Sequence, residues 1–166
     1  MIKPAQLYTI ELKIKLWETV YEERYMFVND GWSDDYSPSG STWSEHEFVS
    51  LSKDNELLGY IRYQVNQRTQ IASGFCAINF STSIVFARDL FRVIDNIFVK
   101  FNMEKLKYGV IVGNPVEKTY DKLTKKYGGR IVGINYRDVK LMDGGYYDSK
   151  NYEIFKEEYL KNRYSL

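Results

Sequence analysis

The segment YGVIVGNPVEKTYDKLTKKYGGRIVG, residues 108–133, constrains the fold more than any other part of this chain. It opens with a short apolar run of the kind found in strands that are buried on both faces. The run stops at Asn-Pro, and the residues that follow have helical spacing until they reach Gly-Gly. The segment therefore predicts a buried strand, then a helix, then a second strand.

The start of this helix is signalled by three residues. Asn114 is expected at the N-cap, because its side chain can accept a hydrogen bond from a backbone N–H that the helix leaves unpaired. Pro115 follows at the first helical position, where a missing N–H costs nothing, and Glu117 stands at capping-box spacing. Gly128 suits the left-handed residue that ends a helix. A helix cap explains Asn114 without any function. The predicted apolar stripe consists of Val116, Tyr120, Leu123 and Tyr127.

The N-terminal region has a helical pattern with a competing signal. Apolar residues recur at helical spacing and predict one amphipathic helix, or two, over residues 5–27. The segment 10–16 also alternates like a strand, but the helical register runs longer. The expected apolar face consists of Leu7, Ile10, Ile14, Trp17, Tyr21, Tyr25 and Val28.

The centre of the chain changes from strand to helix. Three β-rich runs at 47–52, 56–65 and 70–80 are separated by turn signals, and predict an antiparallel meander. Residues 84–101 carry one apolar face and predict a helix. The apolar run 106–113 then predicts a strand parallel to the third run, because a helix connects the two.

The C-terminal part completes the element order. GRIVGINYRDVKLMD predicts two strands or one long strand, and YYDSKNYEIFKEEYLKNR a strand or a helix. We expect a mixed α/β fold in one domain spanning 1–166.

Composition excludes several classes of protein. The net charge is +1 with both signs mixed along the chain, so nucleic acid is not an expected partner. No apolar run is long enough to cross a membrane, so no membrane partner is expected. Cys76 is the only cysteine, which excludes an intramolecular disulfide and a cysteine-based metal site. We expect a cytoplasmic protein that binds no metal, with Cys76 buried as a small apolar residue.

The order of these elements resembles the GNAT acyltransferase superfamily over about residues 44–150. The resemblance is sharpest at GNPVEKTYDKLTKKYGGRIVG, which is similar to the Asn-led helix of the family and the turn after it. FARDLFRVIDNIF, from Phe86 to Phe98, is similar to the cofactor helix of bacterial and phage members in which the glycine-rich signature is eroded. LMDGGYYDSKNYEIFKEEY resembles the usual tail of the family.

The resemblance implies a mainly antiparallel sheet with a central parallel pair flanked by helices. It also implies a V-shaped gap for acetyl-CoA between residues 71–80 and 107–113. The pantetheine amides would pair with backbone groups of the first strand, and the pyrophosphate would lie at the N-terminus of helix 84–101. Ser81 and Thr82 could add hydroxyl donors there. The implied cofactor-binding residues are Ala77, Ile78, Asn79, Ser83, Phe86, Ala87, Arg88 and Asn114.

The resemblance also implies a pair of catalytic groups. Tyr120 is the candidate acid that protonates the leaving thiolate, with Asn114 hydrogen-bonding near the thioester. The candidates for the base are Glu45, His46 and Glu47, of which Glu47 is preferred.

Two functions remain open at this point. The first is transfer of acetyl from acetyl-CoA to an amine, either a small molecule or an amine of a peptide or protein, by direct attack in a ternary complex. The acidic and aromatic loop 29–43, which includes Trp32, Asp34 and Asp35, would suit a cationic acceptor. The second is a catalytically silent GNAT-fold binding or assembly protein, consistent with the absence of glycine in STSIVFARDL. The pattern does not exclude a homodimer.

Overall fold

A computed structural model describes residues 1–20, 22–28 and 43–164. The interpretations of Tyr21 and of the aromatic, acidic loop at Trp32, Asp34 and Asp35 lie outside the described residues.

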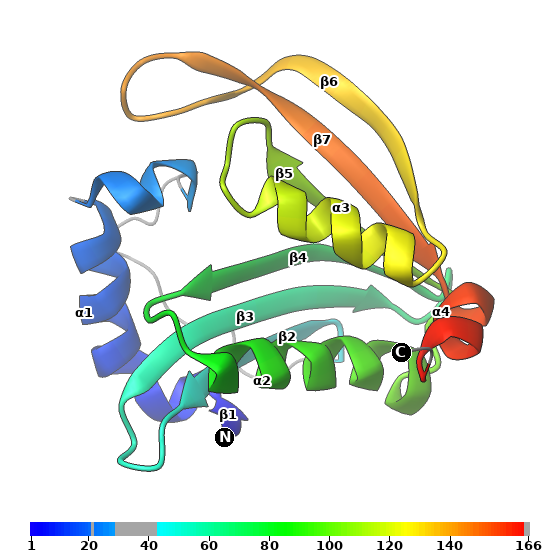
Figure 1. The fold of residues 1–166 in the computed structure, drawn as a ribbon. Coiled ribbons are helices and arrows are strands. Elements are labelled where there is room, and N and C mark those ends of the chain that lie inside the picture. Colours follow the sequence, from blue (N-terminus) through cyan, green and yellow to red (C-terminus); the bar gives the residue numbers. More distant parts are fainter. Residues whose placement is uncertain (21, 29–42, 165–166) are drawn as a thin grey trace.

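The architecture is one mixed sheet of seven strands with helices packed on it, as Figure 1 shows. The strand order is β1-β2-β3-β4-β5-β7-β6, and only the pairing of β4 with β5 is parallel among the paired strands described. This confirms the predicted mixed α/β class, the antiparallel meander and the parallel central pair. The strands are β1 (Ile2–Pro4), β2 (Glu45–Leu51), β3 (Leu57–Asn66), β4 (Ile71–Asn79), β5 (Lys105–Ile111), β6 (Arg130–Lys140) and β7 (Tyr146–Phe155).

The helices connect these strands, and α2 makes the crossover between β4 and β5. Among the described residues, no helix is both long and apolar enough to span a bilayer. The helical elements are the 3-10 turns η1 (Ala5–Tyr8) and η2 (Glu23–Val28), the α-helices α1 (Thr9–Val20), α2 (Ile84–Asp95), α3 (Glu117–Lys126) and α4 (Lys156–Asn162), and a π-helical turn, η3 (Asn96–Lys100), that continues α2.

Apolar residues gather in two clusters. The larger packs α2, α3 and α4 onto the sheet and includes Phe98, Tyr120 and Tyr159. The smaller packs α1 onto residues of β2, β3 and β4, including Tyr60 and Ile78. Successive residues of a strand point to opposite faces, and Ile61, next to Tyr60, belongs to the larger cluster. The two clusters therefore lie on opposite faces of the sheet.

The predicted apolar face of the N-terminal helical region is wrong over its first part, although Tyr25 is buried in the smaller cluster as predicted. Leu7 and Ile10 are 70% and 73% exposed, and Ile14 and Trp17 are also exposed. The buried residues of α1 are instead Leu12 and Leu16, which belong to the smaller cluster. Both sets have helical spacing, so periodicity alone could not decide which of them faces the sheet.

The helix signals around α3 are confirmed, with the start displaced: α3 begins at Glu117 with Val116 at its N-cap, and Asn114 and Pro115 belong to the turn that leads into it. The Asn114 side chain accepts a hydrogen bond from the Val116 N–H at 3.0 Å. Glu117 accepts from the Gly113 N–H at 3.1 Å, one residue earlier than a standard capping box predicts. At the other end, Gly128 has a φ of 67°, and its N–H and that of Gly129 donate to carbonyls of the last turn. These two bonds form a Schellman motif, which turns the chain sharply into β6.

Candidate active site

The parallel strands β4 and β5 are paired over only part of their length. Their register consists of Ile71 with Lys105, Ala72 with Leu106, and Phe75 with Tyr108. It ends there, although β4 continues to Asn79 and β5 to Ile111. Backbone groups of β4 that face β5 beyond this point therefore have no partner on that strand.

A β-bulge in β4 accompanies the end of the pairing. Gln64 and Arg62 of β3 pair with Ser73 and Cys76 of β4, so β4 carries one extra residue between them. Gly74 lies within this interval with a φ of 61°, a conformation that favours glycine. A bulge bends its strand and increases the local twist, which accounts for the separation of β4 from β5.

A cavity of about 310 Å³ lies where the two strands separate. It is lined by both strands, by the junction that precedes α3, and by side chains of η2, β6 and β7. The lining residues are Phe27, Phe75, Cys76, Ala77, Ile78, Gly109, Val110, Ile111, Asn114, Val116, Tyr120, Asp138, Ser149 and Asn151.

The lining side chains come from both faces of the sheet. Lys150 of β7 binds carboxylates of α3, so it points to the face that α3 covers. Its neighbours Ser149 and Asn151 therefore point to the opposite face. Tyr120 belongs to α3 itself. The cavity is thus lined by residues from both faces of the sheet.

Tyr120 is the most deeply buried hydroxyl-bearing side chain of the lining, with 8% of its surface exposed. Its ring meets those of Tyr108 and Tyr152 edge-on, at centroid distances of 5.4 and 6.2 Å. Burial, followed by the proximity of Cys76 and the two tyrosines, raises the pKa of Tyr120 above its ordinary value. The hydroxyl is therefore protonated throughout the neutral range and can act as a donor.

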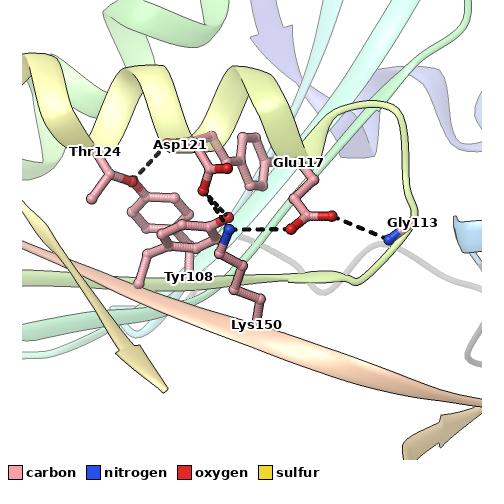
Figure 2. A network of polar contacts seen from close by, with 8 residues as sticks. Tyr108, Gly113, Glu117, Asp121, Thr124 and Lys150 are labelled. Carbon is pink, nitrogen blue, oxygen red and sulfur yellow. Dashed lines mark hydrogen bonds and ion pairs between the residues drawn. The ribbon is translucent and has the colours of Figure 1, made fainter. Parts of the chain in front are cut away.

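A polar network joins α3 to β7 and to the junction that precedes α3, as Figure 2 shows. The Lys150 ammonium donates to Asp121 at 2.7 Å and to Glu117 at 3.1 Å. The Tyr152 hydroxyl also donates to Asp121, at 2.8 Å. These hydrogen bonds, first that from Lys150 and then that from Tyr152, hold the pKa of Asp121 below its ordinary value. Because Glu117 also accepts from Gly113, the network joins β7, α3 and the Asn-Pro junction.

The start of α2, where the sequence predicts a pyrophosphate site, is regular. The Ser83 hydroxyl oxygen accepts a hydrogen bond from the Val85 N–H at 3.1 Å and so caps the helix. Ala87 and Arg88 are exposed on its first turns. Phe86 is instead buried against Gly59, and a Cβ at that glycine would lie 2.3 Å from the Phe86 ring.

The predicted site residues therefore do not all lie together. Ala77, Ile78, Asn114 and Tyr120 meet in the cavity. Ser83, Ala87 and Arg88 lie at the start of α2, while Phe86 belongs to the core. Asn79 is exposed at the end of β4, where its carbonyl accepts a hydrogen bond from Tyr25.

Glu47 lies outside this cavity. It is half-buried on β2, in a separate depression of about 180 Å³ that also contains Glu45 and Arg62. His46 points to the other face of the sheet, where it stacks on Tyr63 and contacts Phe101. The assignment of Glu47 as the base stays a prediction.

A larger depression adjoins the cavity on the face that Asn151 occupies. It measures about 580 Å³, and it shares Phe75, Gly109 and Asn151 with the cavity. Its walls include β6 residues from Val132 to Asn135. This depression provides an approach to the cavity from the face opposite α3.

Sequence reasoning did not find Phe27, Asp138, Ser149 and Asn151 as parts of the site. Their positions depend on the register of β6 with β7 and on how η2 packs, and neither has a local signal in the sequence. Gly74 could have been found, because a glycine inside a strand pattern often marks a bulge. Among the described residues, no group of three or more His, Cys, Asp or Glu side chains is placed to hold a metal ion.

Comparison with known proteins gives matches among solved structures. No family model and no curated protein sequence matches the chain. A variant of the spermidine N-acetyltransferase SpeG from Vibrio cholerae superimposes with a TM-score of 0.69 at 21% identity, covering 98% of each chain. A dodecameric structure of spermidine N-acetyltransferase from the same organism gives a TM-score of 0.61 at 27% identity, covering 74% of this chain and 71% of that one.

These matches extend over most of the chain, and the one with the TM-score of 0.69 covers 98% of it. They support an N-acetyltransferase, and they confirm the resemblance drawn from the sequence: the chain has the fold of the GNAT acetyltransferases.

Proposed function

We propose that this protein is an acyl-CoA-dependent N-acetyltransferase that moves acetyl from acetyl-CoA to an amine by direct attack in a ternary complex. The observation that carries the proposal is the cavity between β4 and β5, with the Tyr120 hydroxyl on its wall. Such a cavity offers a thioester both an open strand edge and a proton donor. The structures that match the chain are named as N-acetyltransferases, which supports the same reaction class.

The residues of the cavity suit the donor substrate. Pantetheine carries two amides, and the backbone of Ala77 and Ile78 borders the cavity on the side where β4 lacks a strand partner. Asn114 lines the cavity while its side-chain oxygen caps α3, so the amide nitrogen of the same side chain is the group available to a ligand. The first turn of the twelve-residue helix α2 has N–H groups that lack carbonyl partners within the helix, and Ser83 caps that of Val85; the positive end of such a helix favours an anion such as a pyrophosphate.

Tyr120 would act as the general acid. When the amine attacks the thioester carbonyl and the C–S bond breaks, the Tyr120 hydroxyl donates its proton to the sulfur. The burial that raises the pKa of Tyr120 also raises the proton affinity of a thiolate formed beside it. The two shifts have the same direction, so the higher proton affinity of the thiolate offsets the weaker acidity of the buried hydroxyl.

The first experiment is a thermal-shift titration with acetyl-CoA and with free CoA. Either ligand at one hundred times its dissociation constant should add about 2.7 kcal/mol to the free energy of unfolding. Release of the CoA thiol is then followed with a panel of primary amines, headed by spermidine, the acceptor named for the matched enzymes.

Tyr120→Phe tests the proposed acid. It should lower kcat by about 10²-fold or more and leave the acetyl-CoA shift in place. Tyr127→Phe is the matched control, because Tyr127 is also a buried tyrosine and follows the last residue of α3 directly. Its ring packs against Tyr159, away from the cavity. Loss of the acetyl-CoA shift in Tyr120→Phe would assign Tyr120 to packing instead.

A GNAT-fold binding protein that does not use acetyl-CoA is the second candidate. The observation that favours it is the start of α2, where no glycine lets a phosphate approach the backbone closely and the Ser83 oxygen already caps the helix. No thermal shift at millimolar acetyl-CoA or CoA would select this candidate and refute the transferase.

A further inference from the structure

Asp138 is the one carboxylate on the wall of the cavity that contains Tyr120, within the part of the chain that the structure describes. We propose that Asp138 binds the incoming amine and accepts the proton that its ammonium group must lose before attack. The proposal rests on the proposed transferase function and names a residue for the part of the site that binds the amine acceptor.

Asp138 reaches the cavity because β6 is irregular at this point. Asn135 pairs with Ser149 and Val139 pairs with Tyr147, so four steps along β6 match only two along β7. The two extra residues form a bulge that turns Asp138 out of the regular alternation of the strand. In a β6 strand without this bulge, the direction of the Asp138 side chain would follow the regular alternation along the strand.

The backbone beside Asp138 is held in an uncommon conformation. Arg137 has a φ of 48°, in the left-handed region, which costs a residue other than glycine on the order of 1 kcal/mol. Its N–H donates to the Asp148 carboxylate at 2.8 Å, and its guanidinium lies 4.9 Å from the centre of the Tyr146 ring. Strain of this kind persists where surrounding contacts enforce it, and it gathers at functional sites.

Neighbouring donors orient the carboxylate. The Ser149 hydroxyl donates a short hydrogen bond to Asp138, and the Asn135 amide donates to the same oxygen at 3.3 Å. Both bonds use Oδ2, so Oδ1 remains available to a ligand. Asp138 is exposed to solvent, which gives a proton accepted there a route to bulk water.

Asp138 and Tyr120 approach the cavity from opposite faces of the sheet. Asp138 accepts a hydrogen bond from Ser149, and the Ser149 side chain points to the face opposite α3. Tyr120 belongs to α3 itself. The depression of about 580 Å³ provides an approach on the Asp138 side. An amine entering there would meet the carboxylate before it reaches a thioester that has Tyr120 on its other side.

The protons of the reaction balance with these two groups. The ammonium gives one proton to Asp138, which passes it to water, and the nitrogen lone pair then forms the N–C bond. The C–S bond breaks, and the sulfur takes the Tyr120 proton. The nitrogen loses a second proton as the amide forms, and this proton restores Tyr120 through solvent. One proton is released for each acetyl group transferred.

The decisive variant is Asp138→Asn, which keeps the shape of the side chain and removes its charge. We expect kcat/KM for an aliphatic amine to fall by about 10²-fold or more, with the acetyl-CoA thermal shift unchanged. For an aryl amine, which is already neutral at pH 7, the loss should be several-fold smaller, because no ammonium proton has to be accepted.

Matched variants separate catalysis from folding. Asp143→Asn is the control in the β6–β7 turn. The Asp143 carboxylate accepts hydrogen bonds from the Gly145 N–H and the Tyr147 hydroxyl outside the cavity, so this variant should keep the activity of the parent. If Asp138→Asn unfolds, Asp138→Glu, which keeps the charge, should fold and retain activity between that of the parent and background. Glu47→Gln, assayed in parallel, should change kcat/KM less than Asp138→Asn does.

Two results would overturn the assignment. Asp138→Asn with kcat/KM within threefold of the parent would refute it while leaving the transferase function intact. An equal loss for aliphatic and aryl amines would also refute proton acceptance by Asp138. A parent protein that neither binds acetyl-CoA nor acetylates any amine would refute the proposed function, and the assignment with it.

Discussion

The Lys150 ammonium of β7 and the Asp121 carboxylate of α3 lie 2.7 Å apart, and they join the two elements that carry Ser149 and Tyr120 to the cavity. Lys150 is 9% exposed and also binds Glu117. This ammonium group therefore contributes, together with the Tyr152 hydroxyl, to holding α3 on β7 at one wall of the cavity.

Replacing Lys150 by Met keeps most of the aliphatic stem and removes the charge. Glu117 and Asp121 would then lie close together without a shared cation, so we expect Tm to fall by roughly 2–6 °C. The control is Lys107→Met, an exposed position on β5, which should leave Tm nearly unchanged. Differential scanning calorimetry at low salt makes the comparison, and equal Tm values for the two variants would contradict this account of the network.

A second prediction concerns the buried hydroxyl pair Tyr108 and Thr124, whose oxygens are 2.6 Å apart. The Thr124 hydroxyl donates its proton to the Tyr120 carbonyl, so Tyr108 is the donor in the pair. Thr124→Val leaves the Tyr108 hydroxyl buried without an acceptor and should cost about 1–3 kcal/mol in urea unfolding. Thr119→Val, exposed on the same helix, should stay within about 0.5 kcal/mol of the parent.

The double variant Tyr108→Phe with Thr124→Val sharpens this test. Removing both partners leaves no stranded donor, so its cost should be smaller than the sum of the two single costs. Simple additivity would show that the two hydroxyls do not interact in solution.

The contact between Gly59 and Phe86 gives a third prediction. A Cβ on Gly59 would lie 2.3 Å from the Phe86 ring and 2.6 Å from the Ile78 carbonyl oxygen. Gly59→Ala must therefore displace α2 or β4, and we expect it to lower the free energy of unfolding by about 1–3 kcal/mol. Gly133→Ala is the control, because nothing lies within 4 Å of a Cβ built there. Comparable stability of the two variants in urea would show that Phe86 does not pack on Gly59 as described.

His46 provides a prediction on pH. Burial, and then the Lys100 charge, lowers the pKa of His46 below 6.5. The unfolded chain therefore binds more protons at this group as the pH falls through 6.5, and stability should decrease as the pH falls from 7 toward the folded pKa. His46 is the only histidine, so its imidazole resonance in a proton NMR titration reports the folded pKa directly.

His46→Phe is the matching variant. It keeps an aromatic ring against Tyr63 and Phe101 and removes the titrating group. The slope of stability against pH between 7 and 5.5 should become flatter. An unchanged slope, or a folded pKa at or above 6.5, would contradict the assigned effect of burial.

Much of the fold was accessible from local pattern. The Asn114 cap and the Gly128 turn are signals carried by a few adjacent residues, and the structure confirms both. The apolar run is confirmed as the strand β5, but the expectation that it is buried on both faces is wrong, because its residues alternate between buried and exposed. The parallel pairing of β4 and β5 followed from one crossover rule. The acetyl-CoA gap was placed by resemblance rather than by pattern.

What escaped prediction depends on contacts between distant residues. The choice between Leu12 and Ile14 as the buried face of α1 is made by the sheet beneath the helix, not by periodicity. Asp138 reaches the cavity only through the slipped register of β6 on β7 and the left-handed Arg137. These two strands are consecutive in the chain, but no residue pattern in them fixes the slipped register, so the sequence predicted Tyr120 and not the carboxylate that lines the same cavity.

The partial pairing of β4 with β5 has a consequence for the sheet as a whole. Among the described strands, β1 to β4 and β5 to β7 form two groups that are hydrogen-bonded to each other at one end only, because the register of β4 with β5 ends at Phe75 and Tyr108. A bound molecule whose own amides run along the β5 side of β4 would act there as a substitute strand. Binding in the gap would then stiffen both groups together, so slower amide hydrogen exchange should extend from Ala77 into β5 and β7.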